Sequence, residues 1–517
     1  MNATRRDFLG GLLASSGLVG CGSLPLAGGG RPLLRFGVVS DVHVRLASGG
    51  ESFEAGYDTA TFERTLEYYR DSGVDAVVIA GDMADTGLLG ELKAVADAWY
   101  RVFPNDRAPD GRKVERVFVF GNHDAFGLKN GKRVFGDMDR VRREAIEADP
   151  MRAWDICFHE EWKPYFKKTV KGFDFFGAHW APGIWCNGIA EAACSGCIEA
   201  FRGPMSKSDP SKPFFYVQHP HPRDTVYGKG AWGVDDGSAS ELLRAFPQAV
   251  AFSGHSHEPL TNERAIWRGE YTSVATGSLR YLSAHSLWNR VRTAGYENGL
   301  CNFYLAGVTR ADRPAYTAKY DAPKVMESQL SRMDIRVGML VSVYADRIEL
   351  AKREFESGLP LDDDWLVELP ARPRGFSVGR KAARPAEFAR GAKLAVRLET
   401  RKTRGEKGNN GTFTAQKDVP ALRLEFPAAI AGGRVAEYEI SSENAAGGRF
   451  STRICAVGGL YPRRHANFAK DVVAAVPASA LPAGAGQVRV TPLDSFGNRG
   501  RSIIAALDMG KHFTQKV

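Results

Sequence analysis

Five short segments of the 517-residue chain bring carboxylate, imidazole and amide side chains together. They are Asp41-Val42-His43, Gly81-Asp82-Met83-Ala84-Asp85, Gly121-Asn122-His123-Asp124, His219-Pro220-His221 and Gly254-His255-Ser256-His257. Each segment follows directly on a short apolar or β-branched run that is typical of a buried strand. A lone histidine is more often a surface or core residue, but five such segments, each behind a strand, indicate one shared site.

These residue types are metal ligands. Carboxylate, imidazole and amide oxygen together suit borderline metals such as Mn, Fe or Zn, and the absence of cysteine among them excludes a cysteine-type structural zinc site. The candidate ligands are Asp41, His43, Asp82, Asn122, His219, His255 and His257. That set is too large for one ion and suits two, which at a spacing of about 4 Å can clamp the attacking and leaving oxygens of a phosphoryl transfer. One carboxylate must then bridge the ions, and we expect it to be Asp82. Glycines before Asp82, Asn122 and His255 predict tight turns there.

The elements that position these segments alternate between strand and helix. Strands are predicted over 33–40, 75–80, 114–120, 173–178, 214–218, 250–253, 271–275 and 302–308, helices over 61–72 and 88–103, and a hairpin over 337–344 and 347–352. Strand–helix–strand order predicts a largely parallel sheet covered on both faces. In such folds ligands bind at the carboxyl ends of the strands, where all five segments fall.

The character of the sequence changes after a proline-containing linker at 364–375. From 376 to 517 only short alternating segments occur, at 394–398, 421–426, 436–441, 449–457 and 487–492, which predicts a β-sandwich resembling fibronectin-type or immunoglobulin-like modules. No catalytic constellation is visible in it. A spacer or stabilising role is favoured over carbohydrate or surface binding.

The first residues predict an export signal. Arg5 and Arg6 precede a weakly apolar run from Gly10 to Gly20, which is too short to span a membrane. This resembles a twin-arginine signal over 1–20, and Cys21 ends a lipobox-like Leu18-Val19-Gly20-Cys21. Acylation of Cys21 would hold the protein at a membrane surface through a flexible tether at 21–32. We therefore expect a lipoprotein on the periplasmic side of a bacterial cell envelope.

Export would also permit disulfides. The remaining cysteines are Cys157, Cys186, Cys194, Cys197, Cys301 and Cys455. Cys194 and Cys197 are predicted to form a local disulfide, or to pair with Cys186, rather than to act as a redox centre. Sequence alone does not fix the pairing.

The motif order D-x-H, G-D-x-x, G-N-H-D, H and G-H-x-H resembles that of the calcineurin-like metallophosphoesterases. The resemblance covers roughly residues 33–310 and includes all five motif blocks. It implies an α/β fold, a two-sheet sandwich within residues 33–363, with a dinuclear centre whose metal-bridging hydroxide attacks phosphate esters. Carried over by motif, one ion would be held by Asp41, His43, Asp82 and His257, and the other by Asp82, Asn122, His219 and His255.

The same resemblance makes His123 a general acid or electrostatic stabiliser beside the phosphoryl group, with Asp124 orienting it. His219 is preferred to His221 as a ligand because it directly follows its strand, which leaves His221 as a residue behind the ligands, a substrate-side residue or an exposed loop residue. His179 could line the pocket or be structural. Residues 181–213 are expected to cap the site, since loops over a catalytic rim often set specificity.

Composition limits the function only broadly. Hydrophobic residues are 44% and charged residues 25% of the chain, as in ordinary globular proteins, and no apolar run approaches the ~20 residues that span a bilayer. The net charge of +9 is spread out, so nucleic-acid binding is allowed but not favoured.

We expect a phosphate ester substrate, either a small molecule, a nucleotide or a phospholipid head group. A nuclease and a non-catalytic surface-binding protein are the rival classes. The oligomeric state is left open.

Overall fold

The computed structural model describes residues 30–45, 56–125, 150–186, 189–192, 200–228, 231, 233–280, 282, 336–355, 358–361, 364–369, 385–402, 418–429, 435, 437–456 and 471–507. The predicted signal at 1–20, most of the tether, the strand predicted over 302–308 and part of the predicted cap lie outside these residues.

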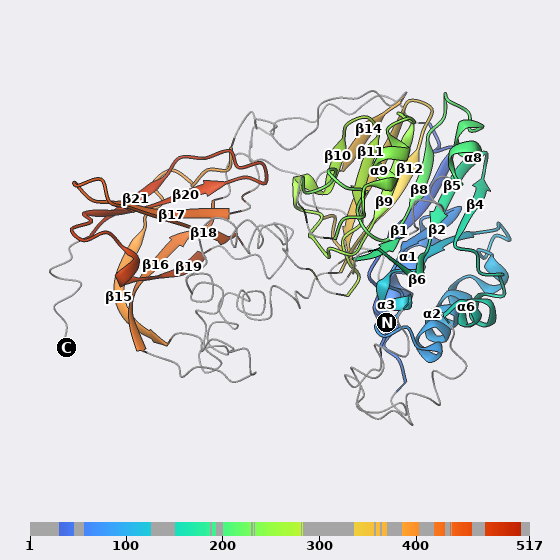
Figure 1. Ribbon diagram of the computed structural model, residues 1–517, viewed down its shortest axis with the longest axis horizontal. Coiled ribbons are helices and arrows are strands. Elements are labelled where there is room, and N and C mark those ends of the chain that lie inside the picture. Colours follow the sequence, from blue (N-terminus) through green and yellow to red (C-terminus); the bar gives the residue numbers. More distant parts are fainter. Residues whose placement is uncertain are drawn as a thin grey trace, which may run out of the picture. The chain divides into compact units, whose positions relative to one another are not determined.

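Two six-stranded sheets form the core of the described N-terminal region (Figure 1). The first has the order β14-β13-β12-β1-β2-β3, with β1 Leu34–Val39, β2 Ala76–Ala80, β3 Glu115–Val119, β12 Val337–Val343, β13 Arg347–Glu354 and β14 Trp365–Glu368. The second has the order β10-β11-β9-β8-β5-β4, with β4 Tyr165–Val170, β5 Phe173–Ala178, β8 Phe214–Val217, β9 Ala249–Ser253, β10 Ile266–Arg268 and β11 Thr272–Ala275. Strands β1, β2 and β3 are parallel, as are β5, β8, β9 and β11, whereas the outer strands pair antiparallel. All five motif segments follow parallel strands, namely β1, β2, β3, β8 and β9.

The sheets pack face to face, and helices cover their outer faces. Helices α1 (Ala60–Asp71), α2 (Leu89–Val102) and α6 (Pro150–Phe158) share one apolar cluster with the outer face of the first sheet. Helices α8 (Arg202–Ser206) and α9 (Ser238–Leu243) share another with the second sheet. In α1 the buried Phe62, Leu66 and Tyr69 recur at helical spacing. The result is the two-sheet α/β sandwich that the motif resemblance implied, whereas the strand–helix order alone predicted one largely parallel sheet covered on both faces.

The layer between the sheets is buried and aromatic. Phe36 of β1 is fully buried, and its ring lies 5.2 Å from that of Phe175, 4.7 Å from that of Phe215 and 5.8 Å from that of Phe252. Those three rings belong to β5, β8 and β9 of the opposite sheet. Because side chains alternate between the two faces of β1, one face of this strand packs against the second sheet. This packing fixes where the ends of the strands of one sheet lie relative to those of the other.

Most predicted elements in the described residues are present within a few residues of their expected bounds, the hairpin β12–β13 included. Strand β14 differs, because it lies inside the segment 364–375 expected to be a linker and pairs with β13. The core sheet therefore extends to Glu368. Aspartates and a proline flank this four-residue edge strand, and its pattern alone resembles a loop. Strand β4 was also missed, since its lysines resemble a solvated turn.

The C-terminal region is all-β in its described residues. A three-stranded sheet contains β15 (Ala395–Lys402), β16 (Asp418–Pro427) and β19 (Asp471–Pro477). A four-stranded sheet contains β17 (Glu437–Glu443), β18 (Arg449–Cys455), β20 (Gln487–Leu493) and β21 (Ile503–Ala506). Both sheets contribute to one apolar cluster, as a sandwich requires. Among described residues of the three-stranded sheet, Arg423 of β16 forms an ion pair with Glu425 on the same strand (2.6 Å) and another with Glu399 on the neighbouring β15 (3.7 Å).

None of the described helices combines the length and the apolarity needed to cross a membrane.

The aromatic layer gives a stability prediction. Phe36→Ala should lower the free energy of unfolding by about 3–5 kcal/mol, because the cavity left between the sheets cannot collapse fully. Urea unfolding followed by circular dichroism measures the change. Leu33→Ala is the control, because Leu33 is 52% exposed just before the same strand, and it should cost less than about 0.5 kcal/mol. Equal losses in the two variants would contradict this account of the core.

Candidate metal centre

The predicted ligands lie where the parallel strands end. Asp41 and His43 follow β1, Asp82 follows β2 and Asn122 follows β3, while His219 follows β8, and His255 and His257 follow β9. The first sheet thus supplies four of these residues and the second sheet three. The sandwich brings both sets to one rim, as expected for open α/β sheets.

The backbone is strained at most of these positions. Five of the seven predicted ligands have left-handed φ angles: Asp41 (52°), His43 (45°), Asp82 (53°), His255 (70°) and His257 (54°). This conformation costs a residue with a side chain roughly 1–2 kcal/mol, and such strain gathers at functional sites. The clustering supports a rim that is shaped by the requirements of a site.

One group of ligand atoms comes from Asp41, His43, Asp82 and His257, which lie within 4.8 Å of one another. Asp41 Oδ1 lies 2.9 Å from His257 Nε2, and His43 Nε2 lies 3.2 Å from the same nitrogen. His43 Nε2 lies 3.6 Å from Asp82 Oδ2. Two ring nitrogens and two carboxylate oxygens therefore face one point.

A second group comes from Asp82, His219 and His255. His219 Nε2 lies 3.1 Å from Asp82 Oδ2, the same oxygen that faces the first group. Asp82 thus belongs to both groups, which is the position predicted for a bridging carboxylate. The structure brings the predicted ligands together in the same two sets that the motif resemblance implied, apart from Asn122, whose Oδ1 is buried.

The other atoms of these side chains are held by the protein. Asp41 Oδ2 accepts hydrogen bonds from Ser40 Oγ and from the His255 backbone N–H (3.1 Å). Asp82 Oδ1 accepts from the His123 backbone N–H (2.9 Å), and His219 Nδ1 donates to the Ala80 carbonyl oxygen (2.7 Å). Such contacts fix the rotamer and the tautomer of a metal ligand.

The inward atoms have the properties of metal ligands. Asp41 Oδ1, Asn122 Oδ1 and His219 Nε2 are buried and make no hydrogen bond. The ring nitrogens near Asp41 Oδ1 lie at ion-pair distance without hydrogen-bond alignment. A buried polar atom without a partner costs roughly 1–3 kcal/mol. Three such atoms among the seven predicted ligands fit bound cations, which would satisfy all of them.

The pKa shifts of the predicted ligands also fit a metal site at the rim. Burial alone would raise the pKa of Asp82, but the neighbouring His219 and His123 hold the pKa of this carboxyl below its usual value. Burial and the nearby His219 lower the pKa of His255, which keeps that imidazole neutral and ready to bind metal. Although burial opposes it, the charge of Asp82 raises the pKa of His219 to about 9. A cation at His219 must therefore displace a proton.

The three glycines before the predicted ligands all provide space, and one of them also provides a turn. Gly81 has a φ of 91°, so it makes the tight turn that we predicted, and a Cβ there would overlap the His219 ring. Gly121 and Gly254 provide space alone. A Cβ on Gly121 would overlap Asp82 Oδ1, and one on Gly254 would overlap Ser40 Oγ and Asp41 Oδ2. At these two positions the prediction of a special turn is replaced by the close approach of a ligand side chain.

His123 lies beside the first group, with its ring centroid 4.6 Å from that of His43. Its Nδ1 contacts the Asp85 carbonyl oxygen at 2.6 Å. Asp124 does not orient this ring, in contrast to the prediction from the motif. Its buried carboxylate instead accepts the backbone N–H groups of Met83 (3.2 Å), Ala84 (2.8 Å) and Gly121 (2.8 Å). Asp124 acts on the backbone that carries the ligands.

Asp85 is the functional residue that sequence reasoning passed over. Its Oδ1 lies 3.1 Å from His43 Nδ1, so this carboxylate orients a predicted ligand, while its carbonyl oxygen holds His123. The signal was present in the sequence, because Asp85 ends the segment Gly81-Asp82-Met83-Ala84-Asp85. Sequence alone does not reveal that the chain turns back toward His43 there.

His221 is neither exposed nor directed at a substrate. It is fully buried, and its two ring nitrogens contact Ser253 Oγ (2.8 Å) and Ser256 Oγ (2.7 Å). Burial lowers its pKa to about 3. Among the alternatives, the structure places His221 behind the ligands, where it braces the segment that carries His255 and His257.

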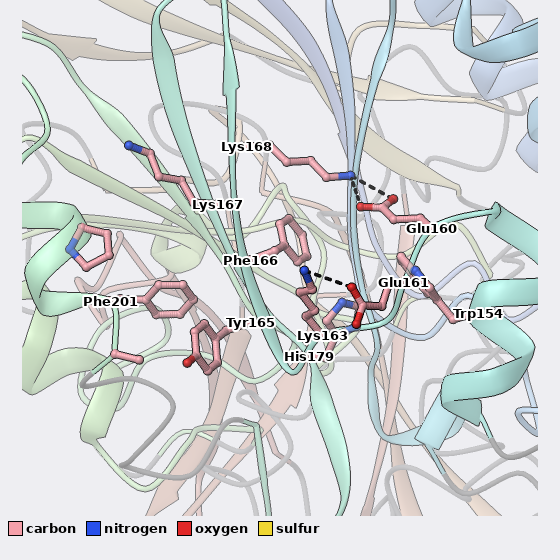
Figure 2. Close-up of a pocket in the computed structure, with 12 residues that line it drawn as sticks. Trp154, Glu160, Glu161, Lys163, Tyr165, Phe166, Lys167, Lys168, His179 and Phe201 are labelled. Carbon is pink, nitrogen blue, oxygen red and sulfur yellow. Dashed lines mark hydrogen bonds and ion pairs between the residues drawn. The ribbon is translucent and has the colours of Figure 1, made fainter.

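His179 is also internal. Its Nδ1 accepts the Phe120 backbone N–H (3.0 Å), and burial lowers its pKa to about 3. It contributes to the wall of a cavity of about 450 Å³ beside β4, together with Trp154, Tyr165 and Phe201 (Figure 2). No predicted ligand lines this cavity. The structure therefore gives no support to His179 as a substrate-side residue of the metal rim.

The expected cap is described only in part. A two-stranded sheet of β6 (Trp180–Cys186) and β7 (Ile189–Ala192) occupies its first residues. Trp180, just before the predicted cap, packs its ring 5.5 Å from that of His255 and 6.0 Å from that of His219. Cys157 is a buried free thiol, and the disulfide pairing of the other cysteines lies outside the described side chains.

The fold and the rim together define an α/β sandwich with a buried cluster of Asp and His side chains that is able to hold metal ions. A family model described as calcineurin-like phosphoesterase matches residues 34–259. All seven candidate ligands and His123 lie within that range. This region therefore belongs to the calcineurin-like phosphoesterase family. No curated protein matches the chain in sequence.

Two solved structures similar to the chain are also phosphoesterases by description. A purple acid phosphatase, PPD1, from yellow lupin (Lupinus luteus) seeds is 12% identical with a TM-score of 0.36, over 65% of this chain and 53% of the lupin chain. A conserved uncharacterized protein described as a predicted phosphoesterase, from Streptococcus pneumoniae TIGR4, is 11% identical with a TM-score of 0.26, over 65% of this chain and 97% of that one. The chain thus spans about half of the lupin protein. With TM-scores this low, the family assignment rests on the family model and the site.

The space provided by Gly121 gives a prediction about the metal site. Gly121→Ala should displace Asp82 and lower metal affinity by at least about 10-fold, the scale on which disturbed ligand support acts. Metal bound per chain, measured by inductively coupled plasma mass spectrometry after dialysis against a metal buffer, tests this. Gly203→Ala is the control, since a Cβ there meets no atom within 4 Å. Full metal content in Gly121→Ala would contradict the assigned role of Asp82.

Proposed function

We propose that the protein hydrolyses phosphate esters with two metal ions held at the rim. One ion would be bound by Asp41, His43, Asp82 and His257, and the other by Asp82, Asn122, His219 and His255. The observation that carries the proposal is the position of Asp82 Oδ2, which faces His43 Nε2 at 3.6 Å and His219 Nε2 at 3.1 Å. Mn, Fe or Zn would suit these ligands.

When bound, the two ions would neutralise charge on the phosphoryl group and lower the pKa of a coordinated water, the proposed nucleophile. The side chains supply two further contributions, the orientation of the ligand rings and a proton donor. Asp85 and Ala80 fix the rings of His43 and His219 through their Nδ1 atoms, which leaves Nε2 of each directed inward. His123 is held through Nδ1, so Nε2 is the atom that can donate a proton or a hydrogen bond to the leaving oxygen.

The substrate is proposed only at the level of a phosphate monoester or diester, with nucleotides and phospholipid head groups included. A nuclease would need a basic groove with stacking aromatics. In the cavity beside β4, the aromatic wall carries lysines that are each paired with a carboxylate: Lys163 with Glu161 (3.1 Å), Lys167 with Asp174 (2.8 Å) and Lys168 with Glu160 (2.8 Å). A purely surface-binding protein would not need a retained His123 beside a full ligand set.

Paired chromogenic substrates test the activity. The purified protein should hydrolyse p-nitrophenyl phosphate or bis-p-nitrophenyl phosphate only with added Mn, Zn or Fe, and Asp82→Asn should abolish turnover together with metal binding. His123→Ala should lower kcat for phenyl phosphate, whose poor leaving group needs an acid, by about 10²–10⁴-fold while both ions stay bound, and should lower kcat for p-nitrophenyl phosphate much less. Absence of turnover with two bound ions would favour the surface-binding class, and loss of metal in His123→Ala would make His123 a ligand.

We further propose that the protein is exported and anchored to the periplasmic side of a membrane, on the basis of residues 1–21 alone. Cys21→Ala should move the protein from the membrane fraction to the soluble periplasmic fraction, and Arg5→Lys with Arg6→Lys should retain it in the cytoplasm. Fractionation of a bacterial host with immunoblotting measures both. Continued membrane association of Cys21→Ala would contradict the acyl anchor without bearing on the catalytic proposal.

A further inference from the structure

The loop between β2 and α2 carries both Asp82 and Asp85, and two buried acidic side chains hold it from opposite ends. Asp124 accepts the backbone N–H groups of Met83 and Ala84. Glu91 in the first turn of α2 holds the far end through one oxygen, Oε2. That oxygen accepts from Thr86 N (2.9 Å), Thr86 Oγ1 (2.9 Å) and Leu88 N (3.2 Å).

The peptide unit between Asp85 and Thr86 connects Glu91 to His123. Its carbonyl oxygen, which belongs to Asp85, contacts His123 Nδ1 at 2.6 Å. Its N–H, which belongs to Thr86, donates to Glu91 Oε2 at 2.9 Å. A trans peptide is planar, with its C=O and N–H on opposite sides, so a bond to one group fixes the direction of the other. Glu91 therefore sets the direction of the carbonyl that holds the His123 ring.

The same chain of hydrogen bonds has an electronic effect. A carbonyl oxygen can only accept, so it keeps a proton on His123 Nδ1 and leaves Nε2 free to face the reacting group. An acceptor on the N–H side of a peptide polarises its carbonyl, because hydrogen bonds in series strengthen one another. Glu91 is 2% exposed, so water does not compete strongly for these bonds.

We propose that Glu91 is a positioning residue for His123, acting through the Asp85–Thr86 peptide to hold the ring in its Nδ1–H tautomer and in its catalytic orientation. The catalytic part of this inference rests on the proposed function. The structural part does not, since it concerns the tautomer of one histidine. The competing view is that Glu91 only caps α2, because Leu88 N is one of the N–H groups that a helix start leaves unpaired.

Nuclear magnetic resonance of the purified chain, selectively labelled with ¹⁵N-histidine and loaded with Zn²⁺, tests the structural part. The His123 signals are identified by their loss in His123→Ala. In the parent and in Glu91→Gln, whose amide oxygen can still accept, Nδ1 of His123 should carry the proton. In Glu91→Ala and in the shortened Glu91→Asp, the ring should become a mixture of tautomers.

Glu63→Ala is the matched control. Glu63 also lies in the first turn of a helix, α1, and accepts a hydrogen bond from the side chain of a neighbouring threonine, Thr59. It should lower stability without changing the His123 tautomer. An unchanged His123 tautomer in Glu91→Asp or Glu91→Ala would overturn the proposal and leave Glu91 as a helix cap. Two substitutions are used so that a folding defect in one does not prevent the measurement.

A double-mutant cycle tests the catalytic part. Glu91→Ala should lower kcat for phenyl phosphate on the order of 10-fold or more, and much less for p-nitrophenyl phosphate, whose better leaving group depends less on an acid. In the His123→Ala background Glu91→Ala should cost less than about 2-fold, since residues that act as one unit are not additive. Equal losses in both backgrounds would overturn a route through His123. If the parent cleaves no phosphate ester, the proposed function fails, while the tautomer still decides the role of Glu91.

Discussion

The single carboxylate of Asp82 is the constraint on which the rest of the core depends. Its Oδ1 is tied to the backbone N–H of His123, so its Oδ2 must face histidines that arrive from both sheets. That is only achieved if β1, β2 and β3 end at the same depth as β8 and β9. The aromatic layer around Phe36 sets this depth, because the sheets cannot slide past interlocked rings without opening cavities.

The rim concentrates features that are unfavourable elsewhere in a protein. Left-handed backbone at five predicted ligands, unpaired buried polar atoms and two carboxylates in one enclosed space all cost free energy. The packed sandwich beneath must offset this cost before any metal binds. Bound cations would remove much of this free-energy cost, because they would coordinate the unpaired atoms and neutralise the negative charge of the carboxylates. Folding and metal binding should therefore be coupled.

Backbone groups do much of the positioning that motif comparison assigns to side chains. Asp124 and Glu91 both act on the loop after β2, and the Asp85 carbonyl holds the ring of His123. A carboxylate that accepts several N–H groups fixes a loop more firmly than a single side-chain contact, because it restrains the peptide planes themselves. Such residues act through the backbone, and the positions of Asp82, Asp85 and His123 depend on them.

The sequence was enough to predict the fold class, through its motif resemblance, the strands that lead into the site and the six aspartate and histidine residues of the two ligand groups, because buried strands and the residues that follow them leave a local pattern. It did not determine the role of Asp124, the contacts of Asp85, the burial of His221 and His179, or the membership of β14 in the core sheet. Each of these depends on groups distant in the chain: Asp124 meets Met83 and Ala84, and His221 meets Ser253 and Ser256. These features follow from the three-dimensional fold, since a side chain's hydrogen-bond partners are set by which strands become neighbours.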